Sequence, residues 1–80
     1  MPMFYFDHDA RGVPFRDEVG DDLADGPAAY VQGTKVMAAW ARDSIGKGEQ
    51  QMHMEMTIRD DSGALWKLAS HFTAKSLREP

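Results

Sequence analysis

The sequence predicts a small α+β domain in which a four-stranded sheet carries a single helix on one face. Two alternating runs of apolar and polar residues precede one helical pattern and two more follow it, which gives the order ββαββ. Of the 80 residues, 42% are hydrophobic and 28% charged, a balance typical of a folded domain. Because this length is too short for two domains, residues 1–80 are expected to form one domain with a thin core.

The first two strands are predicted at residues 3–8 and 13–17, joined by a turn that contains Gly12. Pro14 has no N–H to donate to a neighbouring strand, so the second strand is expected at an edge of the sheet. Side chains alternate between the two faces of a strand. One face of the first strand therefore carries Phe4, Phe6 and His8, and the other carries Met3, Tyr5 and Asp7.

A helix is predicted to begin at Asp25, whose carboxylate can cap the first turn, and to be ended by Gly46 and Gly48, with Gly46 a natural C′ residue. Between them, apolar or small residues recur at spacings of three and four, at Ala29, Gly33, Val36, Met37, Trp40, Ala41 and Ile45. Glycine inside a helix costs about 0.8–1 kcal/mol relative to alanine. We therefore expect Gly33 to allow close approach to a bulky strand residue such as Phe4, Phe6 or Trp66.

The second hairpin is predicted from two alternating runs, at residues 52–58 and 64–75. Their apolar faces match when Ile58 lies opposite Trp66, because opposed residues of an antiparallel pair point to the same side. This register leaves residues 61–63 as a three-residue loop, whose final glycine fits the left-handed position of such a loop. Met52, Met54 and Met56 then belong to the core, together with Met37.

The predicted strand order is the one that needs the simplest connections between strands. The simplest arrangement places the first and last strands side by side and parallel at the centre, with the second and third strands at the edges. This order, 2-1-4-3, is the β-grasp topology. Residues 75–80 are expected to form a fraying tail.

Several short motifs resemble one family. They are Met1-Pro2 followed by Phe4-Tyr5-Phe6-Asp7, then Arg16-Asp17-Glu18-x-Gly20, Ala41-Arg42-Asp43 and Arg59-Asp60-Asp61-Ser62-Gly63. The chain is similar, over nearly its whole length, to a family of short bacterial proteins classed as domain of unknown function 6894. It departs from that family's alanine- and leucine-rich helix at Pro27, Tyr30 and Gly33. The resemblance implies no activity, cofactor or catalytic residue.

Composition argues against several classes of protein. Without cysteine there is neither a disulfide framework nor a thiolate metal site. A net charge of −4 disfavours a nucleic-acid accessory domain, because binding to the phosphate backbone depends on clustered Lys and Arg. The N-terminal residues lack a basic segment and a long apolar run, so we expect neither a signal peptide nor a membrane span, and a cytoplasmic location.

One pair of side chains could carry chemistry. The predicted register places His53 opposite His71 on the polar face, with Glu55 diagonal to the pair, and Tyr5 nearby if the first and last strands are neighbours. Two imidazoles and a carboxylate are ligands that zinc accepts. A divalent metal or a small ligand bound through His53 and His71 is therefore one alternative for the function. The other interpretation is an ordinary cross-strand pair on a solvated face.

Other chemistry has little support. Asp7, Asp9, Gly12 and Glu18 match positions of a calcium-binding loop, but Arg11 stands at a ligand position and the flanking segments are strands. The serines lack the motifs of nucleophilic catalysis, and there is no phosphate-binding loop. We therefore predict a protein that is not an enzyme and needs no cofactor.

The leading hypothesis is a non-enzymatic module for protein interaction or self-association, most simply a homodimer. A single helix leaves the second face of the sheet uncovered, and an edge strand, here the third, offers main-chain groups to a partner. The predicted interaction residues on the open face are Met3, Tyr5, His53, Glu55, Ala69 and His71.

Overall fold

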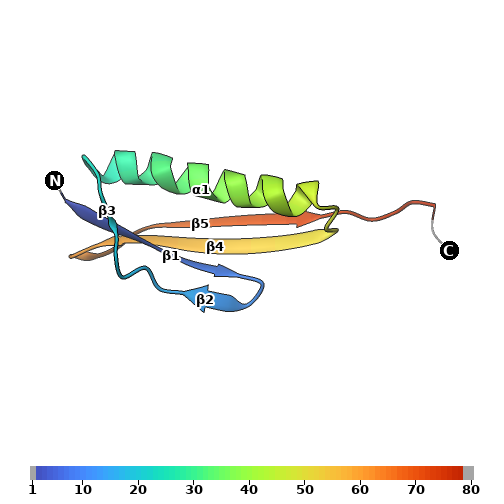
Figure 1. Cartoon of the computed structure of the whole chain (residues 1–80), viewed down its shortest axis with the longest axis horizontal. Helices are drawn as coiled ribbons and strands as arrows, with labels where there is room; N and C mark the ends of the chain where they lie inside the picture. Colours follow the sequence, from blue (N-terminus) through green and yellow to red (C-terminus); the bar gives the residue numbers. More distant parts are fainter. Residues whose placement is uncertain (1, 79–80) are drawn as a thin grey trace.

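The computed structural model describes residues 2–78, so Met1 and the last two residues of the predicted tail lie outside it. It is an α+β fold in which one helix lies against one face of an antiparallel sheet, as the sequence predicts (Figure 1). The elements are β1 (Met3–Ala10), β2 (Val13–Phe15), β3 (Asp21–Asp22), α1 (Gly26–Gly46), β4 (Gln51–Asp60) and β5 (Gly63–Thr73). The predicted ββαββ order thus gains a short additional strand, β3.

The strand order is β2-β1-β4-β5, and every pairing is antiparallel. Strand β3 pairs with the beginning of β1, on the same edge as β2. The predicted order 2-1-4-3, with a parallel central pair, is therefore wrong: β4 lies beside β1, and β5 forms the edge. The connection from α1 to β4 is short, residues 47–50, and α1 runs in the same direction as β1, so the chain returns antiparallel beside β1 (Figure 1).

The core lies between α1 and the centre of the sheet. Met54, Met56 and Ile58 of β4 are 1%, 1% and 0% exposed, because neighbouring strands flank β4 on both sides and α1 covers it. The remaining buried apolar residues are Phe4, Ala29 and Met37. The prediction that the methionine stripe belongs to the core is confirmed for Met37, Met54 and Met56, while Met52 packs at the margin of this cluster.

Gly33 marks the closest approach of α1 to the sheet. A Cβ atom at this position would lie 2.7 Å from Ile58 Cδ1 and 3.3 Å from Met56 Sδ. The helix can therefore approach the sheet this closely only because residue 33 has no side chain. The predicted close approach is confirmed. The predicted neighbours Phe4, Phe6 and Trp66 are wrong, because β4 occupies the place under the helix.

The second hairpin has the predicted central register, with Ile58 opposite Trp66. The predicted three-residue loop is wrong, because Asp60 pairs with Gly63 and leaves a two-residue turn. Leu65 has no opposite residue on β4 and forms a bulge where the register shifts between Ile58 and Arg59. The turn is held by the Asp60 carboxylate, which accepts a hydrogen bond from the Ser62 N–H at 2.8 Å.

The helix begins and ends where the sequence predicts, but its C-terminal cap differs. Asp25 caps it, with its carboxylate accepting from the Ala28 N–H at 2.8 Å. Gly46 is the last helical residue, but the C′ residue with positive φ, 87°, is the second predicted glycine, Gly48, and not Gly46. Within residues 2–78, no helix combines the length and apolar character needed to cross a membrane.

Candidate protein-interaction surface

A polar network joins the outer edge of β1 to β4. Arg59, on β4, reaches across β1, and its Nε donates to Asp7 Oδ2 at 2.8 Å. Its Nη2 donates to the main-chain carbonyl of Asp17 at 2.7 Å. The guanidinium also lies over the ring of Tyr5, 4.5 Å from the centroid, a cation–π contact. Arg59 therefore ties together three segments that are far apart in the sequence.

Asp17 completes this network by binding main-chain groups. Its Oδ2 accepts from the Phe6 N–H at 3.1 Å, and its Oδ1 accepts from the N–H groups of Val19 and Gly20, each at 3.1 Å. Its own N–H donates to Asp7 Oδ1 at 2.9 Å. The Phe6 N–H is a group that would otherwise be free on the edge of β1. Together with β2 and β3, Asp17 thus closes this edge of the sheet to further strands.

The charges in the network stabilise one another. Burial acts to raise the pKa of Asp7, but the hydrogen bonds from Arg59 and from the Asp17 N–H outweigh it, so the pKa lies below its ordinary value. The pKa of Asp17 is also lowered, because the N–H groups it binds and the charge of Arg59 outweigh its burial. The bond to Asp7 raises the pKa of Arg59. All three groups are ionised at neutral pH and are engaged with each other, which indicates a structural role.

The opposite edge of the sheet is formed by β5 and has no neighbouring strand within residues 2–78. The Ala74 N–H points toward β4, because it donates to the Gln50 carbonyl at 2.8 Å. Since main-chain groups alternate in direction along a strand, odd-numbered residues of β5 after the bulge at Leu65 direct their N–H and C=O outward. These residues include Lys67, Ala69 and His71. The sequence-based expectation that the third strand would be the edge is wrong, and the last strand takes that place.

An apolar groove accompanies this edge on the helix side. Tyr30 of α1 packs against Trp66 of β5, with ring centroids 4.8 Å apart, yet the two residues remain 41% and 43% exposed. Beyond them runs a hollow of about 550 Å³ between α1 and β5, whose lining includes Met37, Ala38 and Ala41. Trp66 lies on the apolar face, as the sequence predicts, but α1 does not cover it. No sequence pattern identifies this surface, because only the tertiary structure shows that the strand carrying Trp66 has a single neighbour.

The predicted interaction residues separate into two groups. Met3 and Tyr5 lie at one end of the sheet, where Met3 pairs with Asp22 and Tyr5 is opposite Arg59. His53, Glu55, Ala69 and His71 lie together toward the other end. Positions 53 and 59 of β4 are about 20 Å apart at roughly 3.4 Å per residue. The expectation that Tyr5 would lie near the histidine pair is therefore wrong.

The predicted pairing of His53 with His71 is confirmed, with ring centroids 5.7 Å apart. The Glu55 carboxylate is held between His53 Nε2 and Lys67 Nζ, each at 3.0 Å. The hydrogen bond with His53, followed by that with Lys67, lowers the pKa of Glu55. In the described part of the chain, no three His, Cys, Asp or Glu side chains gather in a geometry that could hold a metal.

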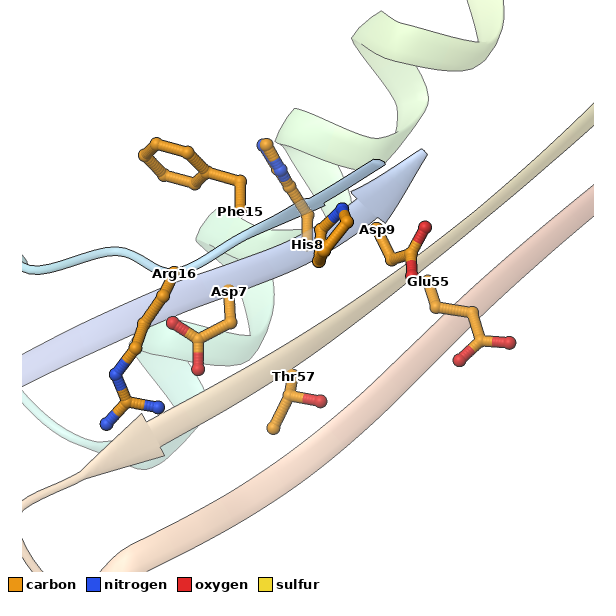
Figure 2. A pocket seen from close by; sticks show the side chains of 8 residues that line it. Asp7, His8, Asp9, Phe15, Arg16, Glu55 and Thr57 are labelled. Carbon is orange, nitrogen blue, oxygen red and sulfur yellow. The ribbon is translucent and has the colours of Figure 1, made fainter. Parts of the chain in front are cut away.

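A shallow hollow of about 270 Å³ lies over β1, β2 and β4 (Figure 2). The side chains of Asp7, Asp9 and Glu55 are spread along the strands rather than directed at one point, although Asp9 and Glu55 are cross-strand neighbours (Figure 2). His8, which also borders the hollow, packs against the rings of Phe15 and Trp40, with centroids 4.8 and 5.4 Å away. The hollow does not assemble the convergent groups of a catalytic site.

Comparison with known proteins agrees with the resemblance seen in the motifs. The model of a family described as a domain of unknown function (DUF6894) matches residues 3–70. No curated protein and no solved structure matches the chain. Asp7, Asp17, Gly20 and Arg59, which stand in the motifs that carry the resemblance, meet in the network at the edge of β1. The chain belongs to the DUF6894 family.

Proposed function

We propose that this protein is a non-enzymatic interaction module that binds a protein partner by strand addition to β5. The observation that carries the proposal is the edge of β5, which has no paired strand among residues 2–78, beside the exposed Tyr30–Trp66 pair. An added strand would bond to the outward N–H and C=O groups, and its side chains would cover the groove along α1.

The two edges of the sheet differ in a way that supports this function. Proteins commonly protect free edges with short strands, prolines, charges or bulges, because an unprotected edge pairs with other chains. The β1 edge has the three-residue β2 with Pro14, and the Asp17 network. In contrast, β5 has 11 residues, no proline and one charged residue, Lys67, and its bulge at Leu65 leaves the rest of the strand regular.

Amide hydrogen exchange measured by NMR tests the proposal, because β5 contains its own control. N–H groups of even-numbered residues from Trp66 to Phe72 point toward β4 and should exchange slowly at every protein concentration. Outward N–H groups of Lys67, Ala69 and His71 should exchange fast in dilute protein and become at least about tenfold slower when a strand pairs with them. The proposal fails if the outward groups exchange rapidly at all concentrations and in the presence of extracts from a bacterial host.

The facing histidines support one alternative, the binding of a divalent metal through His53 and His71, whose rings are 5.7 Å apart. Zinc titration by calorimetry tests it, with the double variant His53→Ala, His71→Ala as control. Equal heats for the native protein and the double variant would end this alternative.

A further inference from the structure

We propose that the strand added to β5 is the β5 strand of a second copy, related by a two-fold axis at Ala69. The two sheets would then form one continuous sheet with both helices on the same face. This inference rests on the proposed function, since it names the partner at the same edge.

The pattern of side chains restricts how two β5 strands can pair. Directly opposed residues of an antiparallel pair point to the same side of the sheet. Even-numbered residues must therefore face even-numbered ones if the apolar faces of the two copies are to join, as Trp66, Leu68 and Phe72 all lie on the helix side. A two-fold axis also places one residue opposite itself. The central positions of the strand, residues 67, 68 and 69, are the candidates for that residue.

Comparison of these centres favours Ala69. An axis at Lys67 would set two lysines opposite each other, which is unfavourable. An axis at Leu68 would place each Trp66 opposite a serine, Ser70. An axis at Ala69 places Trp66 opposite Phe72 twice, and aromatic pairs across strands are favourable. It also leaves the bulged Leu65 outside the central run of pairs.

The main chain and the groove agree with this axis. Ala69 directs its N–H and C=O outward, so two copies could exchange both hydrogen bonds at the axis, and its methyl group leaves room for close approach. Helix α1 and strand β5 run in the same direction (Figure 1). Phe72 lies about 20 Å along β5 from Trp66, and Ala41 lies about 16 Å along α1 from Tyr30. The indole of the second copy would thus reach the part of the groove lined by small alanines.

The absence of cysteine from the sequence allows a direct test with single-cysteine variants. In a hydrogen-bonded antiparallel pair the two Cα atoms are about 5.5 Å apart, within the range of a disulfide. Ala69→Cys should therefore form a disulfide-linked dimer under mild oxidation. Lys67→Cys and His71→Cys are matched controls on the same exposed strand face. Each lies four positions out of register with its own copy, roughly 13 Å away, and should cross-link at least about tenfold more slowly.

Other outcomes separate the register from the proposed function. Cross-linking of Lys67→Cys or His71→Cys at a rate equal to that of Ala69→Cys would overturn the axis at Ala69 while leaving edge pairing in place. If no variant cross-links but the outward amides are protected by another protein, the partner is not a second copy. If no variant cross-links and the outward amides stay unprotected, both proposals fail.

Discussion

Substitution of Gly33 by alanine tests the contact between α1 and the sheet. Alanine is favoured in a helix over glycine by about 0.8–1 kcal/mol. Against this, the new Cβ would lie 2.7 Å from Ile58 Cδ1, so this methyl group must shift within the core, where Ile58 is 0% exposed. Overpacking of this kind costs about 1–3 kcal/mol. We expect Gly33→Ala to destabilise the protein by about 1 kcal/mol, which lowers Tm by about 4–8 °C for a domain of this size.

A second substitution isolates the atom responsible. Ile58→Val removes Cδ1 and should by itself cost about 0.5–1.5 kcal/mol. In the Ile58→Val background the closest obstacle to a Cβ at position 33 is gone, so Gly33→Ala should become neutral or stabilising by up to about 1 kcal/mol. Gly46→Ala is a matched control, because Gly46 is also helical but has nothing within 4 Å of a Cβ. It should not destabilise the protein.

The measurement is the free energy of unfolding by urea, followed by circular dichroism and by Trp fluorescence. All variants must be compared at one protein concentration, because self-association would add to the apparent stability. Stabilisation of the native protein by Gly33→Ala would contradict a tight contact between α1 and Ile58. Effects of Gly33→Ala and Ile58→Val that add within about 0.3–0.5 kcal/mol would contradict it as well, because they would mean that the two positions do not interact.

Three further predictions concern the polar groups. Asp25→Ala removes the helix cap and should cost about 0.5–2 kcal/mol in urea unfolding, whereas an unchanged midpoint would contradict the capping role. The pKa values of Asp7 and Asp17 are lowered by folding, so their contribution to stability is complete well above the unfolded value of about 3.9 and is lost as the pH falls through the folded values. Unfolding midpoints measured from pH 7 to pH 2 should decrease below about pH 5. Arg59→Gln should lower the urea midpoint and raise the pKa of Asp7 in an NMR titration, and an unchanged pKa would show that Arg59 is not its main partner.

The polar network shows why sequence reasoning missed some structural residues. Arg59 is 52 positions from Asp7 and 42 positions from Asp17, and no local pattern relates residues at such distances. Each of them nevertheless stands in a motif that carries the family resemblance. Those motifs were therefore the available signal, although they indicated membership of a family and not which side chains would meet.

The elements and the pairing of the second hairpin could be predicted because they depend on neighbours in the chain. Alternation and a short loop were enough to place Ile58 opposite Trp66 and His53 opposite His71, and a carboxylate before a helical pattern identified Asp25 as the cap.

The position of each strand within the sheet was decided only by the tertiary structure. Strands β4 and β5 have similar alternating patterns, and such a pattern is compatible with a central or an edge position. Strand β4 lies between β1 and β5 and under α1, where Met54, Met56 and Ile58 are buried. This arrangement leaves β5 at the edge of the sheet. The sequence by itself thus determined the one-helix α+β domain and its family. The tertiary structure decided which edge is closed by Asp17 and which edge has no neighbouring strand within residues 2–78, because that depends on contacts between segments distant in the chain.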